Sequence, residues 1–164
     1  MSKAEKTREF IIEKAAPIFN KKGYENTSLS DILAVTKLTK GSIYGNFSDK
    51  NELALAAYQF NATYIFSKVS EAIKSKSSST EAIIAYGDFY FLKWDTVFKV
   101  GGCPMLNAAV EADDHLHYLT NHVRNSFQKF LDLLHYTIEQ GIRNNEFKAE
   151  LNARDYAALI HSIV

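Results

Sequence analysis

The sequence predicts an all-α protein. Apolar residues recur at three- and four-residue steps through most of the 164 residues, and no stretch keeps the two-residue alternation of a strand. Hydrophobic residues make up 46% of the chain and aromatic residues 13%, with only two prolines, which favours a compact core and excludes a disordered chain. One cysteine excludes an internal disulfide, and no apolar run reaches the roughly 20 residues of a membrane span. We therefore expect a helical cytoplasmic protein.

The first predicted helix covers residues 4–22. Ile11, Ala15 and Phe19 fall on one face of it, and charged residues fall on the other. Gly23 follows directly and suits the left-handed conformation that commonly ends a helix. This helix should bury one face against the elements that come next.

Two short helices joined by a tight turn are predicted after it. Ser28 can cap a helix over residues 28–35, and Asp31 three residues later completes a pattern that resembles a capping box. A polar break at Lys37 ends that helix, and Thr39 can cap another. This order of elements is typical of a helix-turn-helix.

The second of these short helices has two distinct faces. Its polar face carries Lys40, Ser42, Tyr44 and Asn46, whereas Leu38, Ile43 and Phe47 point to the core. Such a helix presents polar side chains outward from an apolar base, as a helix that reads DNA does.

The next part of the chain is also predicted to be helical. A long helix has Ser48 as its cap and runs to about Lys74, and residues 75–79 form an exposed serine-rich connection. The following helix is capped by Thr80 and runs to about Phe98.

Two glycines, Gly101 and Gly102, separate that helix from one that opens at Pro104, a favoured residue at a first helical position. The longest periodic stretch covers residues 113–141, and a last helix opens between residues 152 and 155. We expect two domains: a helix-turn-helix domain over residues 1–48, and a helical domain for effector binding and dimerisation over residues 49–164. Because the chain stops inside an apolar pattern without a helix-ending signal, we expect the natural protein to continue.

Charge favours the N-terminal part as the surface for nucleic acid, but only mildly. The formal net charge is zero, with nine Lys or Arg against seven Asp or Glu in residues 1–55. Solvated helix surfaces vary by as much as this.

Three stretches resemble the DNA-binding domain of TetR-family (tetracycline-repressor-type) regulators: GYENTSLSDI, LTKGSIYGNF and DKNEL, all within residues 8–55. The segment GGCPMLNAAVEADD, residues 101–114, also looks like the C-terminal domain of a TetR subgroup. The resemblance implies a homodimer that binds a near-palindromic operator, usually as a repressor. It also implies an unidentified small ligand that binds the C-terminal domain and releases the DNA.

The resemblance also assigns a set of DNA-binding residues. It makes Thr27 and Ser28 caps that contact the backbone, and it makes Lys50 a phosphate contact. The full expected set is Thr27, Ser28, Lys37, Thr39, Lys40, Ser42, Tyr44, Asn46 and Lys50. Lysine, tyrosine and serine side chains can bind phosphate oxygens, while Asn46 or Ser42 could reach a base edge.

Two positions depart from the family pattern. Lys37 stands in the turn where glycine is common, so a bulky residue would have to adopt a left-handed conformation. Gly45 stands where larger residues are common, and it removes a side chain from the reading face.

Aromatic residues of the C-terminal helices could line a mostly apolar ligand pocket, although many of them are ordinary core residues. The candidates for an apolar or aromatic effector are Tyr58, Tyr64, Tyr86, Tyr90, Trp94 and Asn107.

The apolar stripes of the last two helices could pack against a second copy or belong to the core of one chain. The candidate dimer residues are Val123, Phe127, Phe130, Leu131, Leu134, Ile138, Tyr156 and Ile160.

No metal or cofactor is expected. His115 and His117 project from a helix about 200° apart and do not easily serve one ion, so a solvated helix start is favoured. Cys103 precedes a helix N-terminus, which lowers a thiol pKa, but a structural role is favoured because no second cysteine exists.

Motifs of hydrolases and phosphate-binding loops are absent from the sequence. The alternative to a DNA-binding regulator is therefore a helical adaptor that uses the same hairpin for protein contacts.

Overall fold

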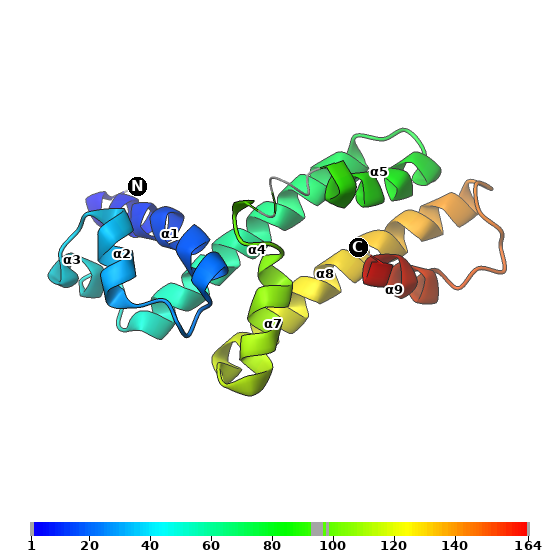
Figure 1. The fold of residues 1–164 in the computed structure, drawn as a ribbon. Helices are drawn as coiled ribbons and strands as arrows, with labels where there is room; N and C mark the ends of the chain where they lie inside the picture. The colour runs from blue at the N-terminus through cyan, green and yellow to red at the C-terminus, as the bar shows by residue number, and fades with distance from the viewer. Residues whose placement is uncertain (1, 93–96, 98, 164) are drawn as a thin grey trace. The chain divides into compact units, whose positions relative to one another are not determined.

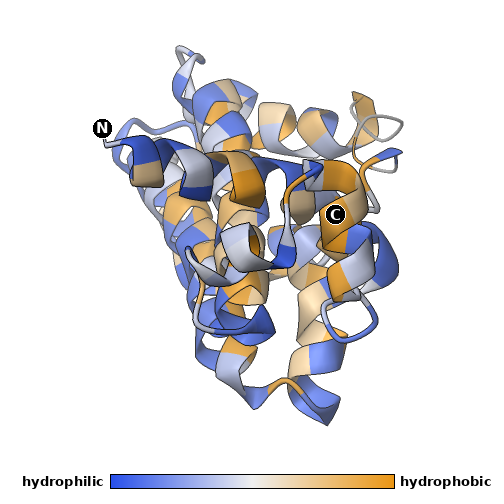
Figure 2. Ribbon diagram, turned by 90° about the vertical axis from the view of Figure 1, so that its left-hand side faces the viewer, coloured by the Kyte–Doolittle hydropathy of each residue, from blue (hydrophilic) through white to orange (hydrophobic). Residues whose placement is uncertain are grey.

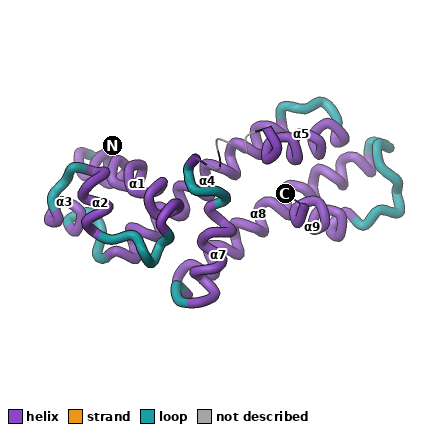
Figure 3. The backbone as a smooth tube through the Cα atoms, viewed as in Figure 1, coloured by secondary structure: helices purple, strands orange, loops and turns teal. Residues whose placement is uncertain are grey.

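The computed structural model describes residues 2–92, 97 and 99–163, and the described residues form helices and loops without a strand (Figure 3). The helices, labelled in Figure 1, are α1 (Lys3–Lys22), α2 (Leu29–Thr36), α3 (Lys40–Tyr44), α4 (Lys50–Lys74), α5 (Ser79–Leu92), α7 (Pro104–Asp114), α8 (His117–Arg143) and α9 (Ala153–Ile163). The predicted all-α class is confirmed. None of the helices within the described residues has the length and apolarity needed to cross a bilayer.

The chain divides into two compact units. Unit 1 comprises Met1–Thr63 and Phe98–Val123, and unit 2 comprises Tyr64–Val97 and Arg124–Val164. Helices α4 and α8 each contribute to both units. The two units group residues by their contacts in space, whereas the boundary expected after residue 48 divides the sequence into consecutive domains. That boundary stays a prediction.

Unit 1 is built on α1, which contacts α2 and α7 (Figure 1). Its core includes fully buried Ile11 and Phe19 from α1 and Tyr58 from α4. The ring of Tyr24 stacks on Phe19 with centroids 5.7 Å apart and meets Tyr58 edge-on at 6.0 Å. Gly23 ends α1 as predicted and has a positive φ of 93°, but its ψ of 154° differs from the left-handed helical cap that was expected. The loop after α1 is thus anchored by an aromatic residue in the core.

Unit 2 has an aromatic core between α4, α5, α8 and α9. Phe66 meets Phe130 edge-on with centroids 5.2 Å apart, and the His161 ring stacks on Phe130 with centroids 5.5 Å apart. His161 also hydrogen-bonds through Nδ1 to the hydroxyl of buried Tyr86. Hydrophobic and hydrophilic bands alternate along the helical ribbons of the chain, as expected for amphipathic helices (Figure 2).

Two predicted helix caps are off by one or two residues. The Asp49 carboxylate, not the Ser48 hydroxyl, accepts the Glu52 N–H at the start of α4. At the start of α5 the Ser78 hydroxyl accepts the Glu81 N–H at 3.1 Å, whereas Thr80 was the predicted cap. Any Ser or Asp in these short polar runs can cap, so the run fixes the helix start only to within a turn.

The stripe of α8 that was a candidate dimer surface is largely core of a single chain. Val123, Phe130, Leu134 and Ile138 are at most 6% exposed. For these four side chains the intramolecular interpretation of the stripe is correct, because an apolar face can be covered by its own chain as well as by a partner. Of the other candidates, Phe127, Leu131 and Ile160 are half-buried and Tyr156 is exposed.

Candidate DNA-binding interface

The N-terminus of α2 carries the predicted capping box. The Ser28 hydroxyl accepts the Asp31 N–H at 3.2 Å, and the Asp31 carboxylate accepts the Ser28 N–H at 2.9 Å. Lys22 donates to the same carboxylate at 2.6 Å, and this bond, with those from Ser28, lowers the pKa of Asp31 to about 2. The start of α2 is therefore stabilised by the hydrogen bonds of the capping box and by the ion pair between Lys22 and Asp31.

The turn between α2 and α3 is made by Lys37 in the left-handed conformation, with φ 58° and ψ 23°. Its N–H donates to the Leu33 carbonyl at 2.9 Å and closes α2. This confirms the conformation expected from the departure at this position. Because Lys37 is exposed, its side chain extends from the turn into solvent.

Helix α3 is short, and two contacts set its direction. The Thr39 hydroxyl accepts the Ser42 N–H at 3.2 Å and caps the helix. On the inner side Ile43 and Phe47 are each 2% exposed, so the helix is attached through an apolar base as predicted. The polar face is therefore held at a defined angle to the core.

The outer face of α3 presents Lys40 and Tyr44, both exposed, with Thr39 exposed at its start. Ser42 and Asn46 are half-buried, and the Asn46 amide donates to the Ser42 carbonyl at 2.9 Å. The structure thus brings Lys40 and Tyr44 together on the exposed face of α3 and joins Ser42 to Asn46 beside it. Asn46 uses one of its two amide hydrogens on its own helix end, so its second amide hydrogen or its side-chain carbonyl oxygen would have to make a base contact.

Thr27 is the predicted contact residue that this surface does not include. Its side chain is 0% exposed, and its hydroxyl donates to the Gly23 carbonyl at 2.6 Å. The sequence interpretation of this side chain as a DNA contact is therefore corrected: the hydroxyl closes the loop before α2. Ser28, the neighbouring cap, is exposed.

Lys50 has a structural task besides its expected phosphate contact. Its ammonium donates to the Glu25 carbonyl at 2.6 Å and lies 3.2 Å from the Thr27 carbonyl. An ammonium has three hydrogens, so one donor is left after these two bonds. The residue ties the first turn of α4 to the loop that leads into α2.

Arg8 of α1 is a residue of this region that the sequence analysis missed. Its guanidinium donates to the Asn46 carbonyl at 2.8 Å and to Glu52 at 2.9 Å, and it lies over the Phe47 ring at 4.0 Å. The Ser48 N–H, with a smaller contribution from Arg8, lowers the pKa of Glu52. Arg8 thus connects α1 to the loop that follows α3 and to the first turn of α4. Its spacing from Ile11 continues the buried stripe of α1, and that periodicity could have identified it.

Comparison with known families identifies both parts of the chain. Residues 11–57 match the family of bacterial regulatory proteins called the tetR family, and residues 80–164 match the tetracyclin repressor-like C-terminal domain. The chain belongs to the TetR family. It is therefore a DNA-binding transcriptional regulator, as the resemblance implied.

Solved structures of TetR-family regulators agree with this assignment. A regulator from Cytophaga hutchinsonii is 36% identical, matches 99% of this chain and 81% of its own, and has a TM-score of 0.94. One from Chloroflexus aurantiacus is 34% identical, matches 99% of this chain and 82% of its own, and has a TM-score of 0.92. A cysteine mutant of the TetR-family regulator CifR, complexed with 26-base-pair double-strand operator DNA, shares the fold at 16% identity. Its TM-score is 0.80 over 94% of this chain and 81% of its own.

The predicted ligand residues are distributed over both units. Tyr58 is 1% exposed in the core of unit 1, and the Asn107 amide there lies 2.7 Å from the Gly101 carbonyl oxygen. In unit 2 Tyr86 is buried and Tyr64 is 56% exposed. Tyr90 meets Tyr86 edge-on at 5.4 Å, and Trp94 lies outside the described residues. A ligand role for these residues stays a prediction, and Asn107 already has a structural one.

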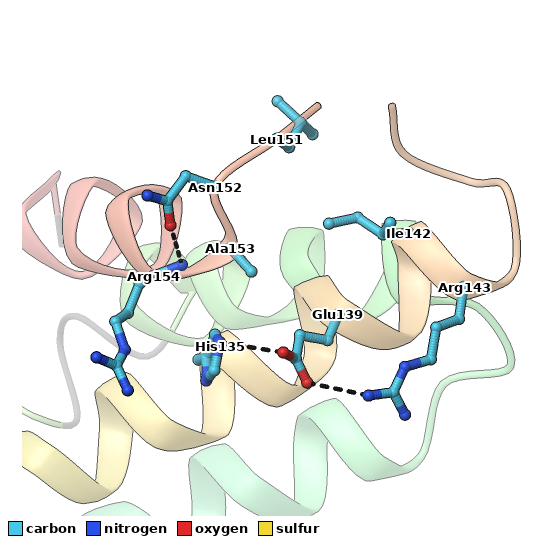
Figure 4. Close-up of a pocket in the computed structure, with 8 residues that line it drawn as sticks. All are labelled: His135, Glu139, Ile142, Arg143, Leu151, Asn152, Ala153 and Arg154. Carbon is cyan, nitrogen blue, oxygen red and sulfur yellow. Dashed lines mark hydrogen bonds and ion pairs between the residues drawn. The ribbon is translucent and has the colours of Figure 1, made fainter. Parts of the chain in front are cut away.

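A charged hollow of about 530 Å³ lies between the end of α8 and the start of α9 (Figure 4). Glu139 lies 3.4 Å from the His135 ring and 3.4 Å from the Arg143 guanidinium, and Arg154 extends from α9. This lining differs from the aromatic one expected of the effector pocket. Nowhere in the described part of the chain do three or more His, Cys, Asp or Glu side chains gather as metal ligands would.

Proposed function

We propose that this TetR-family protein is a homodimeric repressor that binds a near-palindromic operator and is released by a small, mostly apolar or aromatic ligand. The observation that carries the proposal is the solvent-facing pair Lys40 and Tyr44 on a helix held by the Thr39 cap and by buried Ile43. Exposed cationic and phenolic groups on a helix-turn-helix suit phosphate oxygens and base edges of the major groove.

The proposed contact set consists of the expected residues that are exposed or half-buried. It keeps Ser28, Lys37, Thr39, Lys40, Ser42, Tyr44, Asn46 and Lys50, and it omits the buried Thr27 side chain. If each subunit neutralises about three phosphates, the slope of log K against log salt for a dimer is about −5.

A dimer would use the side chains of α8 and α9 that one chain leaves accessible. They include half-buried Phe127, Leu131 and Ile160, exposed Tyr156 and, beside them, exposed Leu159. Two-fold packing of such helices would form a four-helix bundle. Light scattering at micromolar concentration tests this, and a monomer there contradicts it.

Selection of bound duplexes from a random library, followed by a fluorescence-anisotropy titration at several salt concentrations, tests DNA binding. We expect one enriched near-palindrome whose affinity falls steeply with salt. A protein-interaction adaptor would enrich no sequence and would show no salt-dependent DNA binding. The ligand part is tested separately with a compound library: we expect at least one compound to change both thermal stability and operator affinity.

A further inference from the structure

The loop between α1 and α2 is held by a carboxylate from α7. Glu111 accepts the Tyr24 N–H through Oε1 at 2.9 Å and the Glu25 N–H through Oε2 at 2.8 Å. Each oxygen of one carboxylate therefore serves one of two consecutive backbone amides. Hydrogen bonds to an ionised acceptor are stronger than those between neutral groups, so these two bonds stabilise the conformation of the loop.

The opposite side of the same loop is held by a cation. Lys50 of α4 donates to the Glu25 carbonyl, and its nitrogen lies 3.2 Å from the Thr27 carbonyl oxygen. Amide hydrogens thus face an anion while carbonyl oxygens face a cation. The loop leads directly to Ser28, the residue that caps α2.

A second contact from α7 lies one helical turn earlier. Asn107 is four residues before Glu111 and so lies on the same face of the helix. Its amide nitrogen lies 3.1 Å from Asn20 Oδ1 and 3.2 Å from the Asn20 carbonyl oxygen at the end of α1. Asn20 in turn donates to the Val100 and Gly102 carbonyls at 2.8 Å and 3.0 Å.

Glycines make this close approach possible. A Cβ at Gly23 would lie 3.0 Å from Glu111 Oε1, and one at Gly101 would lie 2.9 Å from the Asn20 carbonyl oxygen. Both glycines also have φ near 100°, a conformation that other residues rarely adopt. A side chain at Gly23 would crowd the Glu111 carboxylate, and one at Gly101 would crowd the end of α1, so both glycines leave space for these contacts.

The two residues connect different modules of the sequence. Glu111 and Asn107 lie in the stretch that matches the C-terminal family domain, whereas the loop lies in the stretch that matches the DNA-binding family. Yet α7 and the loop belong to the same compact unit. A helix of the regulatory module thus forms part of the support of the DNA-binding helices.

We infer that Glu111 and Asn107 are positioning residues for DNA binding, through which α7 sets the conformation of the α1–α2 loop and hence the placement of α2. Withdrawal of Glu111 leaves the N–H groups of Tyr24 and Glu25 without their acceptor, and the loop must rearrange to satisfy them. Operator affinity then depends on the position of α7. This inference rests on the proposed DNA-binding function.

The test compares wild type with Glu111→Gln in operator binding and in amide hydrogen exchange. Glutamine keeps the size of the side chain but offers one acceptor oxygen and no charge, so a packing role would survive the change. We expect roughly tenfold weaker operator binding and faster exchange of the Tyr24 and Glu25 amides. The matched control is Asp114→Asn, the same change of charge at an exposed position of the same helix, which should alter neither.

Unchanged affinity with unchanged exchange in Glu111→Gln overturns the inference. If that variant fails to fold, wild type alone decides: amides of Tyr24 and Glu25 that exchange as fast as those of the exposed loop residues Lys148 and Ala149 contradict the contact. If wild type binds no duplex at all, the proposed function fails, while the exchange measurement still judges whether α7 holds the loop.

Discussion

The Lys40 ammonium lies 5.8 Å from the centroid of the Tyr44 ring, one turn away on the exposed face of α3. Such a cation–π pair keeps both side chains extended over the same surface. The charge and the phenol are therefore presented together to any ligand of this face.

Removing the cation should weaken DNA binding whatever the sequence. We expect Lys40→Ala to reduce affinity for operator and random duplex alike by roughly tenfold, and to reduce the salt slope by about one for each phosphate that is no longer neutralised. Anisotropy titrations over a range of salt concentrations measure both. Lys74→Ala, which removes an equal charge from an exposed position at the end of α4, is the control, and equal effects of the two variants would contradict a specific role.

The left-handed turn residue predicts a stabilising substitution. Lys37→Gly should raise the free energy of unfolding by about 1 kcal/mol, because glycine adopts φ 58° without the clash that a Cβ causes. Urea denaturation measures this. If Lys37 also contacts a phosphate, operator affinity falls in the same variant although stability rises. A lower denaturation midpoint would show that the conformation is not strained.

Two helical glycines should respond to alanine in opposite directions. A Cβ at Gly141 of α8 would lie 2.3 Å from the Phe147 ring and 2.9 Å from Ser79 Cβ, so Gly141→Ala should destabilise by about 2 kcal/mol through overpacking. At Gly87 of α5 a Cβ meets nothing within 4 Å, and Gly87→Ala should stabilise by about 0.5–1 kcal/mol. Thermal unfolding of both variants checks the pair, and shifts of the same sign would refute the packing at Gly141.

His161 predicts a loss of stability in mild acid. Burial lowers its pKa below the usual 6.5, so the unfolded chain binds a proton more readily than the folded one. Its contribution to stability is therefore complete above about pH 6.5 and is lost as pH falls below that value. The variant His161→Phe keeps a ring against Phe130, and phenylalanine does not titrate. Between about pH 7.5 and 5 the thermal unfolding midpoint of His161→Phe should fall less than that of wild type. Parallel plots of midpoint against pH for the two proteins would contradict this.

Local signals explain what could be predicted from the sequence. The Ser28–Asp31 box, the Thr39 cap and the left-handed Lys37 each depend on residues three or four positions apart, and the structure has all three. Buried Ile43 and Phe47 follow from the same short-range periodicity. The direction of the reading helix could therefore be predicted without knowledge of any tertiary contact.

Long-range contacts explain what was missed. Arg8 meets Glu52 44 positions away, and Glu111 meets Tyr24 87 positions away, so no local rule pairs them. Both residues nevertheless lie three positions from a buried apolar residue, Ile11 and Ala108 respectively, and a charged group beside the core needs a partner. The α8 stripe shows a different limit of the sequence, since an amphipathic pattern predicts which face is covered but not whether the same chain or a second copy covers it.

The grouping of residues 98–123 with the N-terminal helices has a practical consequence for protein engineering. Chimeric regulators are made by grafting the DNA-reading part of one protein onto the sensing part of another. A graft cut after residue 48 would take the recognition helix but leave behind the carboxylate and the amide of α7 that hold its support. The transplantable part of this protein is discontinuous in sequence, and a graft that keeps its operator preference must carry α7 along.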